Sequence, residues 1–271
     1  MQKQFLSALL LVAAVIVTSV TACKKEENAD DRAKADQAAQ ALRTQQLISS
    51  SFGIALRGAD EADGLVSGDV DDRCGTLIIT PADPAVFPKV ITADFGTGCT
   101  DSDGKTKSGK VILTFGKIWE PGSEISIEYD QYKEDGNSLQ GKFTFQNLST
   151  STAGVFKILA ADIKASDANG YSISYDAEET FTQTAGHPTW WDWSDDVYDI
   201  TGAIDAVLTN GETVKWNIQD PLVKANNCFW VSKGTGTLDL NGLAIGVDYG
   251  DGSCDNKGTV TINGQTYQIT L

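Results

Sequence analysis

Short runs of β-branched and aromatic residues, separated by turn residues, fill the chain from about Val66 to its C-terminus. Several runs alternate apolar and polar side chains, as antiparallel strands with one solvated face do. Asn-Gly and Asp-Gly pairs, which tolerate positive φ, lie between them and favour hairpins. The runs of strand length are residues 77–80, 89–92, 110–115, 125–129, 142–145, 155–158, 171–175, 214–218 and 259–262. This pattern predicts an all-β protein, either an antiparallel β-sandwich or an extended meander.

Two segments of the β region resemble each other and predict an internal duplication. Each has a cysteine, two strands, an Asp-aromatic-Gly turn and a second cysteine, with 24 residues between Cys74 and Cys99 and 25 between Cys228 and Cys254. The repeat favours the disulfides Cys74–Cys99 and Cys228–Cys254, although four cysteines allow three pairings. A metal site is the weaker alternative, because there is no Cys-x-x-Cys spacing.

The N-terminus has the form of an export signal. After Lys3, an apolar run extends from Phe5 to Val20, which is too short to span a bilayer as a helix. Residues 20–23 (Val-Thr-Ala-Cys) resemble a bacterial lipobox. We therefore expect a signal peptide at 1–22 and a lipidated Cys23 that anchors the protein to a membrane; a secretory signal with a chance cysteine is the alternative.

The segment after Cys23 is polar, with two lysines followed by acidic residues. It resembles the surface-export signal of Bacteroidetes lipoproteins, which implies display on the outer face of the outer membrane. We interpret 23–60 as anchor and polar linker, in which 24–50 form a spacer that is either an Ala-rich helix or a flexible stalk. The β region divides into modules 61–150 and 151–271, or forms one continuous domain, 61–271.

Four elements together resemble a group of Bacteroidetes surface lipoproteins: Asp94–Cys99, Lys105–Thr114, Asp195–Gly202 and Asp248–Asp255. The likeness covers most of the mature chain. It implies an extended antiparallel β architecture at the cell surface and brings no catalytic residues with it.

Acidic residues outnumber basic ones by 37 to 21, so the formal net charge is −16. Affinity for nucleic acids depends largely on Lys and Arg that displace counterions. The charge balance therefore argues against a nucleic-acid partner.

One stretch combines aromatic rings with carboxylates and is the candidate ligand site. Rings stack on the C–H faces of sugars and carboxylates accept hydrogen bonds from their hydroxyls, so the stretch suits a glycan. The alternative is that the tryptophans belong to the core. The candidate residues are Trp190, Trp191, Trp193, Asp195, Asp196 and Tyr198.

Calcium is the one cofactor that the sequence suggests, at residues 101–104 (Asp-Ser-Asp-Gly) or at Asp251 and Asp255. Neither loop has the full EF-hand register, and Asp beside Gly is typical of ordinary turns. No catalytic or metal-ligating residue is assigned, since the single histidine, His187, has no nucleophile elbow with it.

The leading functional prediction is a non-catalytic binding or structural lipoprotein whose partner is a glycan or another surface protein. A glycan-binding lipoprotein that uses residues 190–198 is the specific alternative. A carboxylate-dependent glycoside hydrolase is the third, because a chain with 37 acidic residues could supply a suitably spaced pair.

Overall fold

The structure is a computed structural model that describes residues 28–43, 45, 74–83, 85–100, 104–117, 120–186 and 193–271. A helix at 29–43 precedes the strands. Within the described part, no helix has the length and apolar character needed to cross a bilayer. The strands and one 3-10 helix are β1 (Thr76–Thr80), β2 (Lys89–Asp94), β3 (Cys99–Thr100), β4 (Thr106–Phe115), β5 (Glu124–Glu134), β6 (Asn137–Asn147), β7 (Val155–Ser166), β8 (Ser172–Ala185), η2 (Trp193–Asp195), β9 (Val197–Leu208), β10 (Thr213–Ala225), β11 (Lys233–Leu240), β12 (Leu243–Asp251), β13 (Lys257–Ile262) and β14 (Gln265–Thr270).

All strands belong to one 14-stranded antiparallel sheet, in which each strand pairs with the next along the chain, except that β2 pairs with β4 and β3 pairs only with β4. The predicted all-β class is confirmed, and of the two architectures named above it is the extended meander. The sheet continues across position 150, because β6 pairs with β7 from Asn147 opposite Phe156 to Ser138 opposite Ser166.

Three of the predicted Gly-containing turns form tight hairpins with positive φ at both central residues. These turns are Asp135-Gly136, Asn241-Gly242 and Asn263-Gly264. In type I′ turns the backbone twist matches that of the flanking strands, so these pairs fix the strand register.

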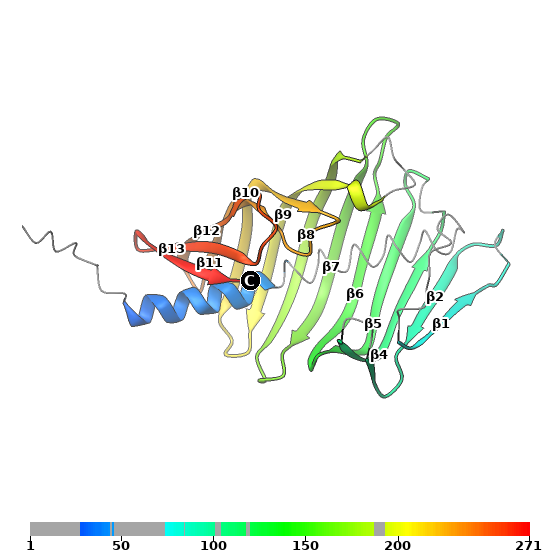
Figure 1. Cartoon of the computed structure of the whole chain (residues 1–271), viewed down its shortest axis with the longest axis horizontal. Coiled ribbons are helices and arrows are strands. Elements are labelled where there is room, and N and C mark those ends of the chain that lie inside the picture. Colours follow the sequence, from blue (N-terminus) through cyan, green and yellow to red (C-terminus); the bar gives the residue numbers. More distant parts are fainter. Residues whose placement is uncertain are drawn as a thin grey trace, which may run out of the picture.

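The sheet is curved by a series of β-bulges. Register shifts interrupt each strand pairing from β4·β5 to β11·β12. A bulge bends its strand and increases the local twist. Figure 1 shows the outcome, with β10–β13 turned over beside the N-terminal helix at one end and β1 and β2 at the other. We call the face that carries the buried side chains the inner face.

The helix at 29–43 is part of the folded body. Ala35 and Ala38 are fully buried, and Leu42 is nearly so. Leu42 lines a small apolar cavity with Trp216 and Leu238 of the inner face, with room for about one water molecule. Of the two forms predicted for the spacer, the structure therefore has the helix. A flexible stalk is wrong for residues 29–43, because the alanine side of this helix packs on the sheet.

Polar contacts hold the start of the helix to the last hairpin. Asp31 accepts hydrogen bonds from Asn263 Nδ2 (3.1 Å) and Tyr267 Oη (3.5 Å). Arg32 Nη1 donates to the carbonyl oxygen of Gln268 in β14 (3.1 Å). The helix thus lies against the β14 edge of the sheet.

Both predicted disulfides are present. Cys74 bonds to Cys99 and Cys228 to Cys254, with Cα–Cα distances of 5.6 and 5.8 Å. Each bond joins the two ends of a local hairpin, β1–β2 in one case and β11–β12 in the other. In the chain-entropy model a loop of this size contributes about 3.5 kcal/mol to stability.

The two predicted copies also contain the same hydrogen-bonded turn. The carboxylate of Asp94 accepts a hydrogen bond from the amide of Gly96 (2.9 Å), and that of Asp248 accepts one from Gly250 (2.8 Å). All four residues occupy matching places in the Asp-aromatic-Gly elements, so the sequence likeness reflects one local structure used twice.

Candidate functional site

The predicted ligand stretch leads into the start of β9. Trp190 and Trp191 lie outside the described residues, and Trp193 opens η2. Asp195 is exposed, whereas the side chain of Asp196 is buried. Of the carboxylates predicted to bind a ligand, Asp195 therefore reaches solvent and Asp196 faces the protein.

Asp196 and Tyr198 are buried at the start of β9, where they pack and form hydrogen bonds within the protein. Tyr198 is 2% exposed and packs its ring between those of Phe156 and Phe181, with both centroids 6.3 Å away. Its hydroxyl donates to Asp196 Oδ2 (3.0 Å), and Gln183 Nε2 donates to Oδ1 (2.6 Å). The structure thus places Tyr198 in the core.

The loop 226–232, between β10 and β11, adjoins this stretch. The amide of Asn226 donates a hydrogen bond to the carbonyl oxygen of Asp196 (3.0 Å). Three residues further on, Phe229 is 52% exposed and meets Trp230 edge-on, with ring centroids 4.8 Å apart. Trp230 is partly buried against the core, so Phe229 packs on a side chain that the core holds in place. We call η2, Asp196 and the loop 226–232 the aromatic rim.

A cation from the first half of the chain lies over the rim. The Lys105 ammonium is 5.4 Å from the centroid of the Phe229 ring, and it forms an ion pair with Glu134 at 2.9 Å. An ammonium above an aromatic face is attracted by the ring quadrupole. Because Lys105 precedes β4 and Phe229 precedes β11, the curved sheet brings segments of both predicted modules together here.

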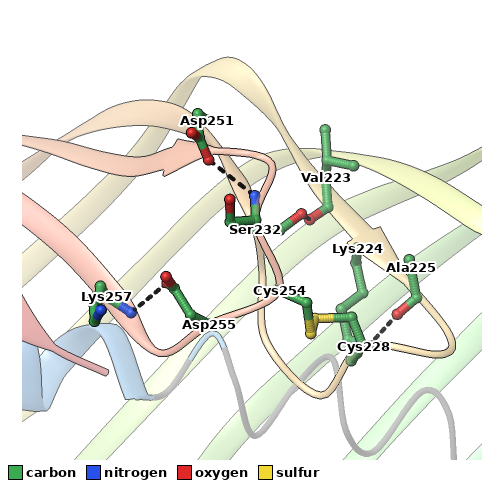
Figure 2. Close-up of a disulfide and its surroundings, with 10 residues drawn as sticks. Val223, Lys224, Ala225, Cys228, Ser232, Asp251, Cys254, Asp255 and Lys257 are labelled. Carbon is green, nitrogen blue, oxygen red and sulfur yellow. Dashed lines mark hydrogen bonds between the residues drawn. A yellow bond between two sulfur atoms is a disulfide. The ribbon is translucent and has the colours of Figure 1, made fainter.

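The disulfide Cys228–Cys254 fixes the loop that carries Phe229 (Figure 2). Lys224 is buried beside it, and its ammonium donates to the carbonyl oxygens of Ala225 (2.8 Å) and Cys228. Ser232 closes the loop, since its amide donates to the carbonyl oxygen of Val223 (3.0 Å). The exposed ring is therefore presented by a rigid loop.

Sequence reasoning identified the acidic part of the rim and missed its aromatic pair. Phe229 and Trp230 directly follow Cys228, and two adjacent aromatic residues outside any alternating strand pattern are the signal that could have found them. Lys105 had no comparable signal, because its contact with Phe229 depends on the curvature of the whole sheet.

The residues suggested for calcium act as turn residues where the structure describes them. Asp251 accepts the amide hydrogen of Ser253 (3.0 Å), and hydrogen bonds from Ser253 lower the pKa of Asp251. Asp255 accepts the amide of Lys257 (3.0 Å), as Figure 2 shows. Residues 101–103 lie outside the described part, and within that part no group of three or more His, Cys, Asp or Glu side chains could hold a metal ion.

A second polar feature lies inside the curved sheet. Glu179 occupies an inward position on β8 and is fully buried, and burial raises its pKa to about 8 although a hydrogen bond from Gln45 acts in the opposite direction. Within the described ranges, the Oε1 atom of Glu179 and the hydroxyls of Tyr175 and Tyr249 have no hydrogen-bond partner. Tyr249 belongs to β12 and is also buried, and burial raises the pKa of its hydroxyl.

Comparisons of the chain with protein-family models, with curated proteins and with solved structures gave no match.

Proposed function

We propose that this chain is a non-catalytic lipoprotein, anchored through Cys23 at the outer surface of the outer membrane, that binds a glycan at the aromatic rim. One observation carries the proposal. Phe229 is half-exposed on a disulfide-fixed loop whose backbone is hydrogen-bonded to Asp196, next to the exposed Asp195.

The chemistry of the rim suits a saccharide. An exposed ring offers a stacking surface for the C–H face of a sugar. The exposed carboxylate of Asp195, whose neighbour Asp196 is hydrogen-bonded to the Phe229 loop, can accept hydrogen bonds from sugar hydroxyl groups. The disulfide and the Lys224 hydrogen bonds hold the Phe229 loop in place before any ligand binds. Such preorganisation reduces the entropy lost on binding.

The test compares the full chain with its Phe229→Ala variant on a broad glycan array. Binding by the parent that weakens at least about tenfold in the variant supports the proposal, because truncating a stacking ring at a binding surface typically costs more than about 1 kcal/mol. Val207→Ala is the matched control, since Val207 is 46% exposed near the end of β9 that lies opposite to Asp196. It should bind as the parent does.

A second variant tests the tryptophans of the original stretch. Trp190, Trp191 and Trp193 are replaced together by alanine, and circular dichroism establishes that the sheet is retained. Absence of glycan binding by the parent, or equal binding by the parent, the Phe229 variant and the tryptophan variant, would refute a glycan site at the rim.

A further inference from the structure

The two edges of the sheet differ. At one end, β14 lies beside the N-terminal helix, and Arg32 donates a hydrogen bond to the carbonyl oxygen of Gln268. At the other end, β1 pairs with β2 and, among the described residues, with no further strand. An open edge offers a row of backbone donors and acceptors to another strand. The kind of partner that fits β1 is therefore an extended strand.

The composition of β1 suits strand addition. Its sequence is Thr-Leu-Ile-Ile-Thr, without a charged residue or a proline, which are the residues that commonly protect an edge. Ile78 is 50% exposed, whereas Leu77 and Ile79 are only partly buried against the core. The disulfide at Cys74, two residues before the strand, secures it to the β2 side.

We propose that two copies of this chain associate by antiparallel pairing of β1 with β1, with the two-fold axis at Ile78. In this register Thr76 lies opposite Thr80 of the other copy, and Leu77 lies opposite Ile79. Apolar and hydroxyl cross-strand pairs of this kind each contribute favourably to sheet stability. Leu77 and Ile79 of both copies would then extend the core across the axis, which covers the apolar surface that the edge leaves open.

The charge distribution favours a second copy at this edge. The chain has a formal net charge of −16, so most contacts between copies bring like charges together. β1 has no charged residue, and Asp94, which is opposite Thr76 in β2, is paired with Lys110 at 3.0 Å. The β1 edge is therefore a place where two copies meet without opposing carboxylates.

The same arrangement limits assembly to two copies. A contact between identical patches about a two-fold axis is closed, and growth into a fibre needs a second open edge. The helix at 29–43 lies against β14, where that edge would be. The proposal does not depend on glycan binding at the rim, because β1 contributes no residue to the rim.

The test measures the mass of the full chain in detergent by light scattering, at a series of micromolar concentrations. The expected result is a dimer whose dissociation constant rises at least about tenfold in Ile78→Lys, because two lysines would then face each other across the axis. Val207→Lys is the matched control: Val207 is 46% exposed in β9, a strand in the middle of the sheet, and its variant should remain dimeric.

A second variant tests the register directly and does not require loss of the dimer. Ile78→Cys should form a cross-link between copies under mild oxidation, because directly opposed residues of an antiparallel pair have Cα atoms about 4.5 to 5.5 Å apart. A monomeric parent, a dimer unaffected by Ile78→Lys, or a dimer that Ile78→Cys does not cross-link would each overturn the proposal. Binding of an unrelated extended peptide by a monomeric parent would assign the edge to that partner instead.

Discussion

Gln45 Nε2 donates a 3.0 Å hydrogen bond to Oε2 of Glu179, across 134 positions of the sequence. Both side chains are buried, one at the C-terminal side of the N-terminal helix and the other on the inner face of β8. This bond joins the helix to a carboxyl group that the interior keeps protonated at neutral pH, since its pKa is raised to about 8.

Glu179→Gln should change how stability depends on pH. The unfolded chain releases the Glu179 proton near the usual pKa of 4.5, whereas the folded protein keeps it up to about 8. Between these two pH values the folded state therefore holds one more proton than the unfolded state. The stability contribution of the protonated Glu179 carboxyl is present in full below pH 4.5, and the free energy of unfolding falls as the pH rises to 8. The loss is on the order of 4 to 5 kcal/mol, at about 1.4 kcal/mol per pH unit.

The measurement is the free energy of unfolding in urea from about pH 5 to about pH 8, the interval between the two pKa values. The stability of the parent relative to the variant should fall steadily over this range, because the glutamine side chain introduced in the variant does not titrate. Glu178→Gln serves as the comparison, since Glu178 is exposed and pairs with Lys157 at the surface. A parent-minus-variant difference that is constant with pH would contradict the assignment to Glu179.

Leu42→Ala should lower the free energy of unfolding by roughly 2 to 4 kcal/mol, because it enlarges a buried apolar cavity beside Trp216. Arg43→Ala, at the exposed neighbouring position, should change stability by less than about 0.5 kcal/mol. Thermal unfolding of both variants tests whether the helix belongs to the folded body. Equal transitions would mean that it does not.

Gly202→Ala should destabilise the protein by about 2 kcal/mol or more, since φ at Gly202 is 137° and an added Cβ would overlap the carbonyl oxygen of Glu178. Gly246→Ala is the matched change in β12, where the nearest atom to an added Cβ is 3.7 Å away. Differential scanning calorimetry should show a clear decrease in melting temperature for the first variant only. A similar decrease in both would mean that the close approach to β8 is not the cause.

Most of the strands and the cysteine pairing could be predicted because their determinants are local, although β9 (Val197–Leu208) was not among the predicted runs. Alternation, turn pairs such as Asn241-Gly242 and the repeated Asp-aromatic-Gly elements each depend on a few adjacent residues. The choice between a sandwich and a single meander could not be made locally, since it depends on bulges that set the curvature over many strands.

The helix and the site were harder to predict for different reasons. Ala35, Ala38 and Leu42 have helical spacing, but alanine buries so little area that the stripe resembles that of a solvated spacer. Glu179 occupies a core position of an alternating strand, where a carboxyl group is rare enough to have been a signal. Phe229 and Lys105 meet only because distant strands curve toward each other.

The docked helix also fixes how far the body can stand from a membrane. If Cys23 carries the proposed lipid, only residues 24–28 connect it to residue 29, where the helix begins. Fully extended, this connection spans at most about 20 Å. A stalk of the predicted length would let the sheet sample a wide volume above the bilayer. With that lipid, the short connection would instead keep the β13–β14 end close to the bilayer surface, so any partner would have to approach the membrane to reach the protein.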